Sequence, residues 1–355
     1  MYDKIKMVII MKTKNKRKMK KSIKIILSLL LVITIGYISI TVLKHFDNQE
    51  MLIPLPVQPN KKEEKDSITK KLEKLSYNDN EITLIQEYVT EENINYLINN
   101  KINHEIAYNF INEKYYIDDY LTAYIEYYNE HREKSYSEIV TIINTHTNNE
   151  FYTNTIKTDT TLGKFVILNK YYYADDTYPS ENIIKVDGKY HINGTSFYLN
   201  KECYEAFLKM YNDAYKAGYG FKMKSAYRSY DTQVSTYNYW VSTENGDKEK
   251  ADIYSARAGF SEHQTGYAFD IRDYDYKYED YSKSESFKWV SKNAHKYGFI
   301  IRFPKGKEHI TGYQYESWHY RYCGVECATY IYENDITFEE YYEYFIKYNN
   351  PKNLS

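Results

Sequence analysis

The stretch Ser261-Glu-His-Gln-Thr-Gly-Tyr-Ala-Phe-Asp-Ile, residues 261–271, combines two metal-binding residue types with the pattern of a turn followed by a buried strand. Gly266 permits a tight turn between His263 and Asp270. The apolar residues around Asp270 predict a strand that presents this carboxylate inward. Burial of such a carboxylate costs free energy unless a metal or a charged partner interacts with it. The stretch therefore predicts a short β-strand that carries part of a functional site.

Two further stretches concentrate unusual chemistry: Ser225-Ala-Tyr-Arg-Ser-Tyr-Asp-Thr-Gln233 and Glu316-Ser-Trp-His319. A catalytic zinc ion takes three protein ligands from histidine and carboxylate and leaves a fourth position open. His263, Asp270 and His319 supply such a set. A single histidine is more often a core or surface residue, so the joint pattern, rather than any one residue, predicts a Zn²⁺ site.

A zinc hydrolase also needs a carboxylate that accepts a proton from the attacking water and returns it to the leaving amine. Glu316, three residues before His319, is the candidate base, and its alternative role would be to orient a metal ligand. Glu262 is the competitor, but neighbouring residues of an extended chain point to opposite faces, so we expect it to face solvent. Arg228 could bind a carboxylate or an oxyanion with its planar guanidinium group.

The chain from about residue 160 onward alternates Tyr/Val/Ile-rich segments, glycine turns and helical patterns, which predicts the α+β class. Apolar residues at helical spacing predict helices over residues 201–218 and 284–297. Strands are expected at residues 221–226, 268–271, 299–303 and 317–322. Residues 67–150 show helical periodicity throughout, with Thr90 as the expected cap of one helix, and predict a small all-helical domain.

The N-terminal region differs sharply in charge from the rest of the chain. Residues 1–24 carry ten Lys/Arg and one acid, which leaves 37 bases and 48 acids for residues 25–355. A body with this acidic excess is not expected to bind nucleic acid. The basic tail instead precedes residues 25–43, which are nineteen uncharged residues and long enough to cross a bilayer.

These features predict a single-pass membrane protein with residues 1–24 in the cytoplasm, a transmembrane helix at 25–43, and the remainder outside the cell membrane. A cleaved signal peptide is the alternative, but the apolar run is long and no small-x-small cleavage site follows it. Residues 44–66, with Pro54, Pro56 and Pro59, are expected to form a linker.

The pattern Ser-x-His-x-x-Gly-x-Ala-x-Asp followed by Glu-x-Trp-His, after a Tyr-Arg-Ser-Tyr-x-x-Gln segment, resembles the VanY-type D-alanyl-D-alanine carboxypeptidases of the M15 zinc metallopeptidases. The resemblance covers roughly residues 160–345 and begins with Val166-Ile-Leu-Asn-Lys170. Departures are mild: Ala226 stands where glycine is frequent, and Ser317 stands where many relatives have proline. Neither change removes a metal ligand or the base.

The resemblance implies a small antiparallel sheet with flanking helices and zinc in a cleft. It implies that His263, Asp270 and His319 bind Zn²⁺, that Glu316 is the base, and that Arg228 stabilises the transition state. Gln233 and Ser261 match positions that hold the substrate. The implied reaction is removal of the terminal D-alanine from peptidoglycan stem peptides by metal-activated water.

Three other functions remain open at this stage. A peptidoglycan endopeptidase would share the zinc ligands but would need no free terminal carboxylate. A D,D-dipeptidase acts on a small cytoplasmic substrate, which the expected anchor disfavours. A wall-binding module without catalysis would have no need of Glu316 beside a complete set of ligands.

Overall fold

The computed structural model describes residues 61–348 apart from 179–181, 193–195, 275–276 and 278–279. The chain divides into two compact units, Met1–Asp66 and Ser67–Ser355. The basic tail, the predicted transmembrane helix and most of the predicted linker lie outside the described residues. Within the described ranges, no helix combines the length and apolar character needed to cross a membrane.

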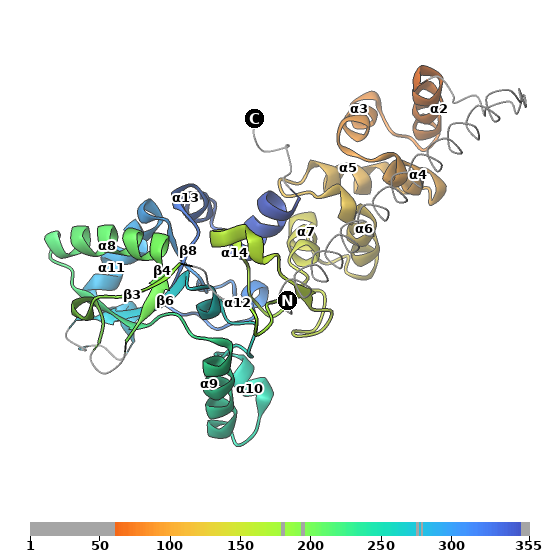
Figure 1. The fold of residues 1–355 in the computed structure, drawn as a ribbon. Coiled ribbons are helices and arrows are strands. Elements are labelled where there is room, and N and C mark those ends of the chain that lie inside the picture. Colours follow the sequence, from red (N-terminus) through yellow and green to blue (C-terminus); the bar gives the residue numbers. More distant parts are fainter. Residues whose placement is uncertain (1–60, 179–181, 193–195, 275–276, 278–279, 349–355) are drawn as a thin grey trace, which may run out of the picture. The chain divides into compact units, whose positions relative to one another are not determined.

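The first part of the described chain is helical (Figure 1). Its elements are α2 (Lys61–Glu73), α3 (Asp79–Tyr88), α4 (Glu91–Asn99), α5 (His104–Asn112), η1 (Asp118–Tyr120), α6 (Leu121–Glu130) and α7 (Tyr136–Asn144). These helices share a core built from Leu72, Ile85, Leu97, Phe110, Leu121 and Ile139, among others. The helical periodicity of residues 67–150 therefore corresponds to amphipathic helices that bury one face.

Two features of this part add detail to what the sequence predicts. Residues 61–66, expected in the linker, form the start of α2, because Lys and Glu are strong helix formers even without apolar residues. Thr90 does stand at the N-cap of α4, but its side chain makes no capping hydrogen bond. Its backbone N–H instead donates to Asp118 Oδ2 at 2.9 Å.

The second part mixes short strands with helices, which confirms the α+β class. Before the central sheet come β1 (Ile156–Lys157), η2 (Thr160–Phe165), β2 (Tyr172–Tyr173), β3 (Ile183–Lys185), η3 (Gly188–Tyr190), β4 (Tyr198–Asn200) and α8 (Lys201–Lys216). The central elements are β5 (Phe221–Ser225), α9 (Tyr230–Thr243), α10 (Lys248–Asp252), η4 (Glu262–Thr265), β6 (Ala268–Asp273), η5 (Tyr281–Lys283), α11 (Glu285–Asn293) and η6 (Ala294–Tyr297). The chain ends with β7 (Phe299–Ile301), α12 (Glu308–Thr311), β8 (His319–Tyr322), α13 (Val325–Asn334), α14 (Phe338–Tyr341) and the π-helix η7 (Tyr342–Lys347).

The central sheet has four antiparallel strands in the order β5-β6-β8-β7. Successive residues of a strand point to opposite faces of the sheet. Phe269 and Ile271 of β6 and Tyr320 of β8 therefore enter the apolar core, while Asp270 and His319 project from the other face. One face of the sheet stabilises the fold, and the other is available for chemistry.

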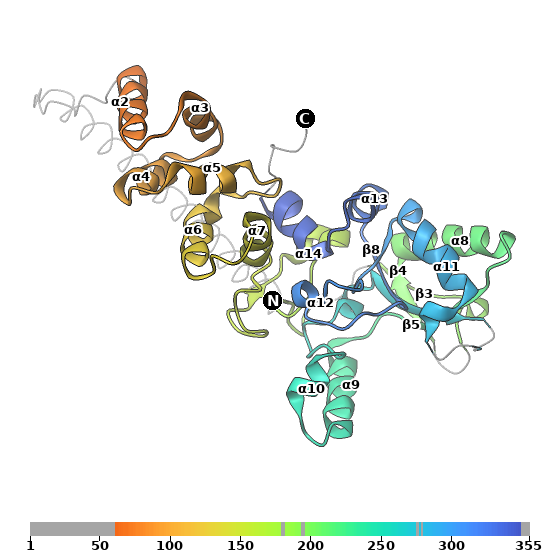
Figure 2. The ribbon, with the colours of Figure 1, turned by 180° about the vertical axis from the view of Figure 1, so that it is seen from behind.

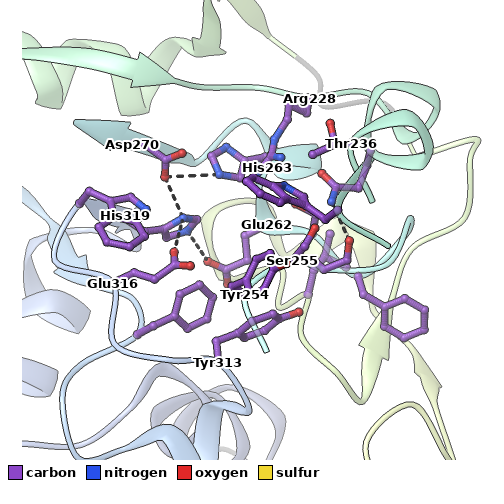
Figure 3. A pocket seen from close by; sticks show the side chains of 18 of the residues that line it. Arg228, Thr236, Tyr254, Ser255, Glu262, His263, Asp270, Tyr313, Glu316 and His319 are labelled. Carbon is purple, nitrogen blue, oxygen red and sulfur yellow. Dashed lines mark hydrogen bonds and ion pairs between the residues drawn. The ribbon is translucent and has the colours of Figure 1, made fainter. Parts of the chain in front are cut away.

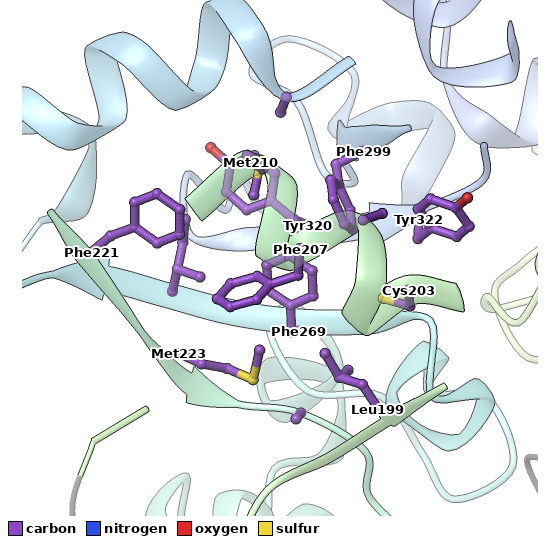
Figure 4. Close-up of a cluster of buried hydrophobic side chains, with 14 of the residues drawn as sticks. Leu199, Cys203, Phe207, Met210, Phe221, Met223, Phe269, Phe299, Tyr320 and Tyr322 are labelled. Atoms are coloured by element: carbon purple, nitrogen blue, oxygen red, sulfur yellow. The ribbon is translucent and has the colours of Figure 1, made fainter. Parts of the chain in front are cut away.

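The apolar face is covered by α8 and α11 (Figure 4). Phe207 of α8 packs edge-on against Phe269 with ring centroids 5.3 Å apart, and both side chains are fully buried. Met210 of the same helix and Val290 of α11 complete the contact. Burial of aromatic and aliphatic side chains at this density holds β6 and β8 in a fixed register.

The helical part packs against the C-terminal elements within the unit Ser67–Ser355. Thr141 Oγ1 of α7 donates to Glu340 Oε1 of α14 at 3.4 Å, and Figure 2 shows these two helices as neighbours. His146 contacts Glu343 at 3.1 Å, and the rings of Tyr115 and Tyr344 meet edge to face. The boundary between a 67–150 helical domain and a 160–345 catalytic domain stays a prediction.

Candidate metal centre

Three predicted ligands converge on the polar face of the sheet (Figure 3). Asp270 of β6 and His319 of β8 are paired across the sheet, so their side chains emerge side by side. His263 lies in η4, which ends at Gly266 with a left-handed φ of +71°. This turn, accessible to glycine at little cost, returns the chain into β6. The predicted role of Gly266 as the turn residue is thus confirmed.

The donor atoms of the three side chains all lie within 4.8 Å of one another. His263 Nε2 lies 3.6 Å from Asp270 Oδ1, and His319 Nδ1 lies 3.0 Å from the same oxygen. His263 Nδ1 contacts the backbone oxygen of Ala226 at 2.7 Å, which fixes the proton on Nδ1 and leaves Nε2 free to bind a metal. Two imidazoles and one carboxylate are the donor set of a catalytic zinc site, and the set fits Zn²⁺.

The electrostatics of this cluster also suit a cation. Burial raises the pKa of Asp270, but His263 and His319 outweigh burial and hold it well below its usual value. Burial lowers the pKa of His263 to about 4, with Arg228 acting in the same direction, so its imidazole is neutral at pH 7. Burial also opposes the charge on His319, but Asp270 and other carboxylates raise its pKa to about 9. Asp270 is therefore ionised and His263 neutral, the forms in which both bind a metal, whereas His319 carries a proton that a bound metal would displace.

Glu316 lies beside these ligands, with its Oε2 3.7 Å from His319 Nδ1. Its backbone N–H donates to Phe303 O at 3.0 Å, which holds the segment before β8 against the site. Burial raises the pKa of its carboxyl group to about 8. A buried carboxyl group with a raised pKa in a cleft is typical of a group that transfers protons.

The other predicted site residues line the same cleft. Arg228 follows β5, and its backbone N–H donates to His263 O at 3.1 Å. Burial lowers the pKa of its guanidinium group, an effect that the charges of Asp270 and Glu316 oppose. Gln233 on α9 is fixed by its Nε2 donating to Ala256 O at 2.7 Å. Gln233 Oε1 is buried and has no hydrogen-bond partner among the described residues. Ser261 is buried at the cleft wall.

The cleft has a volume of about 450 Å³ and includes several aromatic side chains. The sequence analysis assigned no role to these aromatic lining residues, of which only Trp318 stands in a quoted motif; they are Trp240, Tyr254, Phe260, Phe303, Tyr313 and Trp318. Tyr313 packs against Lys170, whose buried Nζ lies 4.5 Å from the ring centroid and donates to Asp252 O at 2.6 Å. Lys170 thus joins the segment before the sheet to the end of α10, which borders the cleft.

Two polar residues of the site were also missed or misplaced. Glu262, expected to face solvent, is 3% exposed and is ion-paired with Arg302 and Arg321. The expectation failed because residues 262–265 form a 3₁₀ turn, in which neighbouring side chains do not alternate between two faces. Lys224 lines the cleft from an irregularity between Met223 and Ser225 in β5, and β-bulges of this kind redirect side chains.

Comparison with known proteins agrees with this geometry. The sequence profile of the family described as "VanY: D-alanyl-D-alanine carboxypeptidase" matches residues 196–325. The putative carboxypeptidase YodJ of Bacillus subtilis (strain 168) is 41% identical over 182 residues, which cover 50% of this chain and 66% of that protein. This chain therefore spans slightly less than two thirds of the length of that relative.

Two solved structures are also similar. The LdcB LD-carboxypeptidase is 39% identical over 50% of this chain and 85% of its own, with a TM-score of 0.46. A mutant of the vancomycin-resistance D,D-pentapeptidase VanY, solved in complex with Zn(II), is 28% identical over 50% of this chain and 98% of its own, with a TM-score of 0.44. The profile match over residues 196–325 and the identity to YodJ thus show that this part of the chain is similar to the VanY-type D-alanyl-D-alanine carboxypeptidases.

Proposed function

We propose that this protein is a zinc-dependent carboxypeptidase that removes the terminal D-alanine from peptidoglycan stem peptides. The observation that carries the proposal is the convergence of His263, Asp270 and His319 with the carboxyl group of Glu316 in one cleft. The match of residues 196–325 to the VanY family profile supports the substrate class. A wall-binding module without catalysis would not need a buried carboxyl group with a raised pKa at the metal ligands.

The bound Zn²⁺ would polarise the scissile carbonyl and lower the pKa of a water molecule. Glu316 accepts a proton from the water that attacks the carbonyl carbon, and it returns this proton to the amine nitrogen as the C–N bond breaks. The pKa of Glu316, about 8 without a metal, suits both steps. A bound cation would favour the ionised carboxylate, which is the form that accepts the proton from water. The carboxyl group formed in this way then donates the proton to the amine.

The substrate's free carboxylate would pair with Arg228, which faces the cleft and whose Nε has no hydrogen-bond partner among the described residues. A guanidinium group binds a carboxylate through two parallel hydrogen bonds and so fixes the orientation of the terminal residue. Gln233 offers its unpaired Oε1 as an acceptor for a substrate N–H. Ser261 would shape the wall beside His263.

We further propose that residues 25–43 anchor the protein in the cell membrane as a single span, with the catalytic domain outside. The support is the uncharged run of nineteen residues directly after the basic tail. Access to the wall polymer would follow from this placement. Protease treatment of intact cells should remove an epitope at the C-terminus but leave one at the N-terminus, and protection of both would exclude the arrangement.

The reaction is tested by measuring free D-alanine released by the purified chain from a peptide that ends in D-Ala-D-Ala. We expect release with zinc, none after chelation, and restoration when zinc is added back. Glu316→Gln should retain zinc and lose about 10²–10⁴-fold in kcat. Failure of zinc-loaded wild type to release D-alanine would contradict the proposal.

Two further substrates separate the neighbouring activities. A peptide with an amidated C-terminus should be a poor substrate for a carboxypeptidase, whereas an endopeptidase would tolerate the amide. A peptide with one terminal D-alanine after an L-residue reports an L,D-carboxypeptidase. Cleavage of this second peptide in preference to D-Ala-D-Ala would replace the proposed D,D specificity.

A further inference from the structure

Beneath the metal ligands lies a cluster of four charged side chains that are almost completely buried: Glu262, Arg302, Arg321 and Glu339. Arg302 Nε donates to Glu262 Oε1 at 2.8 Å, and its two terminal nitrogens donate to Glu339 of α14 at 2.9 and 2.6 Å. Arg321 Nη1 donates to Glu262 Oε1 at 3.0 Å. The cluster thus links α14 to η4, the turn that also carries His263.

The two oxygens of Glu262 have different surroundings. Oε1 accepts from both arginines, whereas Oε2 is buried and accepts no hydrogen bond from any described residue. Buried carboxylate oxygens normally have partners, so an oxygen left free at this depth calls for an explanation. A candidate partner is His319, whose Nε2 lies 3.9 Å from Oε2.

The atom His319 Nε2 likewise lacks a hydrogen-bond partner among the described residues. It is buried, while Nδ1 of the same ring faces Asp270 and Glu316. A neutral imidazole that binds a metal through Nδ1 carries its proton on Nε2. That proton would then point at the one carboxylate oxygen that the arginines leave free.

We propose that Glu262 is a positioning residue that accepts the Nε2–H of His319 and thereby fixes the ring and its tautomer for metal binding through Nδ1. The inference rests on the proposed metal site. At 3.9 Å the two atoms are beyond hydrogen-bond distance, so a small rotation of the ring or the carboxylate completes the contact.

The other histidine ligand has a matching arrangement with the nitrogens exchanged. His263 contacts Ala226 O through Nδ1 and faces Asp270 through Nε2. Each imidazole therefore has one nitrogen toward the metal position and the other toward an acceptor inside the protein. Such partners orient metal-binding histidines and raise their basicity, and their loss typically weakens metal binding about 10–100-fold.

The test compares Glu262→Gln with Glu339→Gln in the full chain. Each substitution removes one negative charge from the same cluster, but only Glu262 faces His319. In Glu262→Gln the arginines retain the amide oxygen as their acceptor, so the NH₂ group opposes His319 Nε2–H, donor against donor. Zinc affinity is measured by competition with a chromophoric chelator, together with the melting temperature of each metal-free protein.

We expect Glu262→Gln to weaken zinc binding about 10–100-fold. Glu339→Gln should lower the melting temperature but cost far less zinc affinity than this, because Glu339 does not contact a metal ligand. Equal losses of affinity in both variants, or an unchanged affinity in Glu262→Gln, would overturn the proposal. If wild type itself binds no zinc, the proposed function fails instead, so the two failures are distinguishable.

A measurement on wild type covers the case in which Glu262→Gln does not fold. Nitrogen-15 spectra of histidine-labelled, zinc-loaded protein report which ring nitrogen carries the proton, and the signal of His319 is assigned by its loss in His319→Gln. A proton on Nε2 with the shift of a strong hydrogen bond is the expected result. A proton on Nδ1 of His319 would exclude the assigned role of Glu262.

Discussion

Asp270 and His319 occupy directly opposed positions on the antiparallel strands β6 and β8, and Asp270 Oδ1 lies 3.0 Å from His319 Nδ1. The sheet therefore holds two of the three metal ligands by its own hydrogen-bond register, without dependence on a flexible loop. Only His263 is supplied by a turn, and that turn is itself buried. A site placed on strands in this way is preorganised for the metal.

Replacement of Asp270 by asparagine should abolish high-affinity zinc binding. The carboxylate is the only anionic member of the triad and faces both histidines, so its loss should cost more than the roughly 10–100-fold that follows loss of an indirect partner. Zinc content after dialysis measures the effect. Asp273→Asn, at the end of the same strand, is the matched control and should retain its metal.

Replacement of Arg228 by lysine distinguishes the two roles that the guanidinium group could have. If the guanidinium group binds the terminal carboxylate, kcat/KM should fall about 10–100-fold for the natural peptide, since hydrogen bonds to charged groups contribute about 1.5–3 kcal/mol. For the amidated peptide, which has no such carboxylate, kcat/KM should change little. Equal losses on both substrates would place Arg228 at the reacting carbonyl instead. Steady-state kinetics on the two peptides decide between these outcomes.

The aromatic contact between α8 and β6 predicts a stability effect. Phe269 is fully buried, so Phe269→Ala should lower the free energy of unfolding by about 3–5 kcal/mol. Tyr215→Ala on the exposed side of α8 should change it by no more than about 0.5 kcal/mol. Urea denaturation of both variants provides the measurement, and similar values for the two would contradict the assigned core.

Lys170 predicts a pH dependence of stability. Burial lowers its pKa from 10.5 to about 8, so between these values the unfolded chain holds a proton that the folded chain has released. Unfolding then takes up a proton, and the free energy of unfolding gains up to about 1.4 kcal/mol per pH unit as pH rises through this window. Below pH 8 both states are protonated and this contribution does not change with pH.

The measurement is the difference in unfolding free energy between wild type and Lys170→Met from pH 7 to 10.5. Titration of the many tyrosines affects both proteins and is removed by the subtraction. Wild type should gain stability relative to the variant above pH 8. Parallel curves across the whole range would show that Lys170 keeps its usual pKa in the folded protein.

The sequence predicted the four strands of the central sheet, whose apolar and aromatic residues stand out from the flanking segments, but not the short strands β1 to β4. The strand expected at 221–226 is β5 (Phe221–Ser225), and those around Asp270 and His319 are β6 and β8. The helices over 201–218 and 284–297 are α8 and the pair α11 and η6, since their apolar spacing matches the core they bury. Local pattern and tertiary packing agree in these elements.

The border of the cleft was not predicted, for a physical reason. In α9 the buried residues are Gln233 and Tyr237, so this helix has no apolar stripe from which periodicity could reveal it. The contacts of Glu262 with Arg302 and Arg321 join residues about 40 to 60 positions apart, and no local pattern encodes such pairs. Three ligands could be found from their residue types, but their partners required the fold.

Core-facing and metal-facing side chains alternate along β6 and β8, and this alternation limits which insertions and deletions the sequence tolerates. Because Phe269 belongs to the core and its neighbour Asp270 to the metal centre, deleting one residue between Gly266 and Asp270 would exchange the two sides of the strand. Folding and metal binding would then be lost in one event. Insertions and deletions should therefore be tolerated outside this strand pair, in surface segments such as the turn between α9 and α10, where substrate preference could diversify while the reaction is retained.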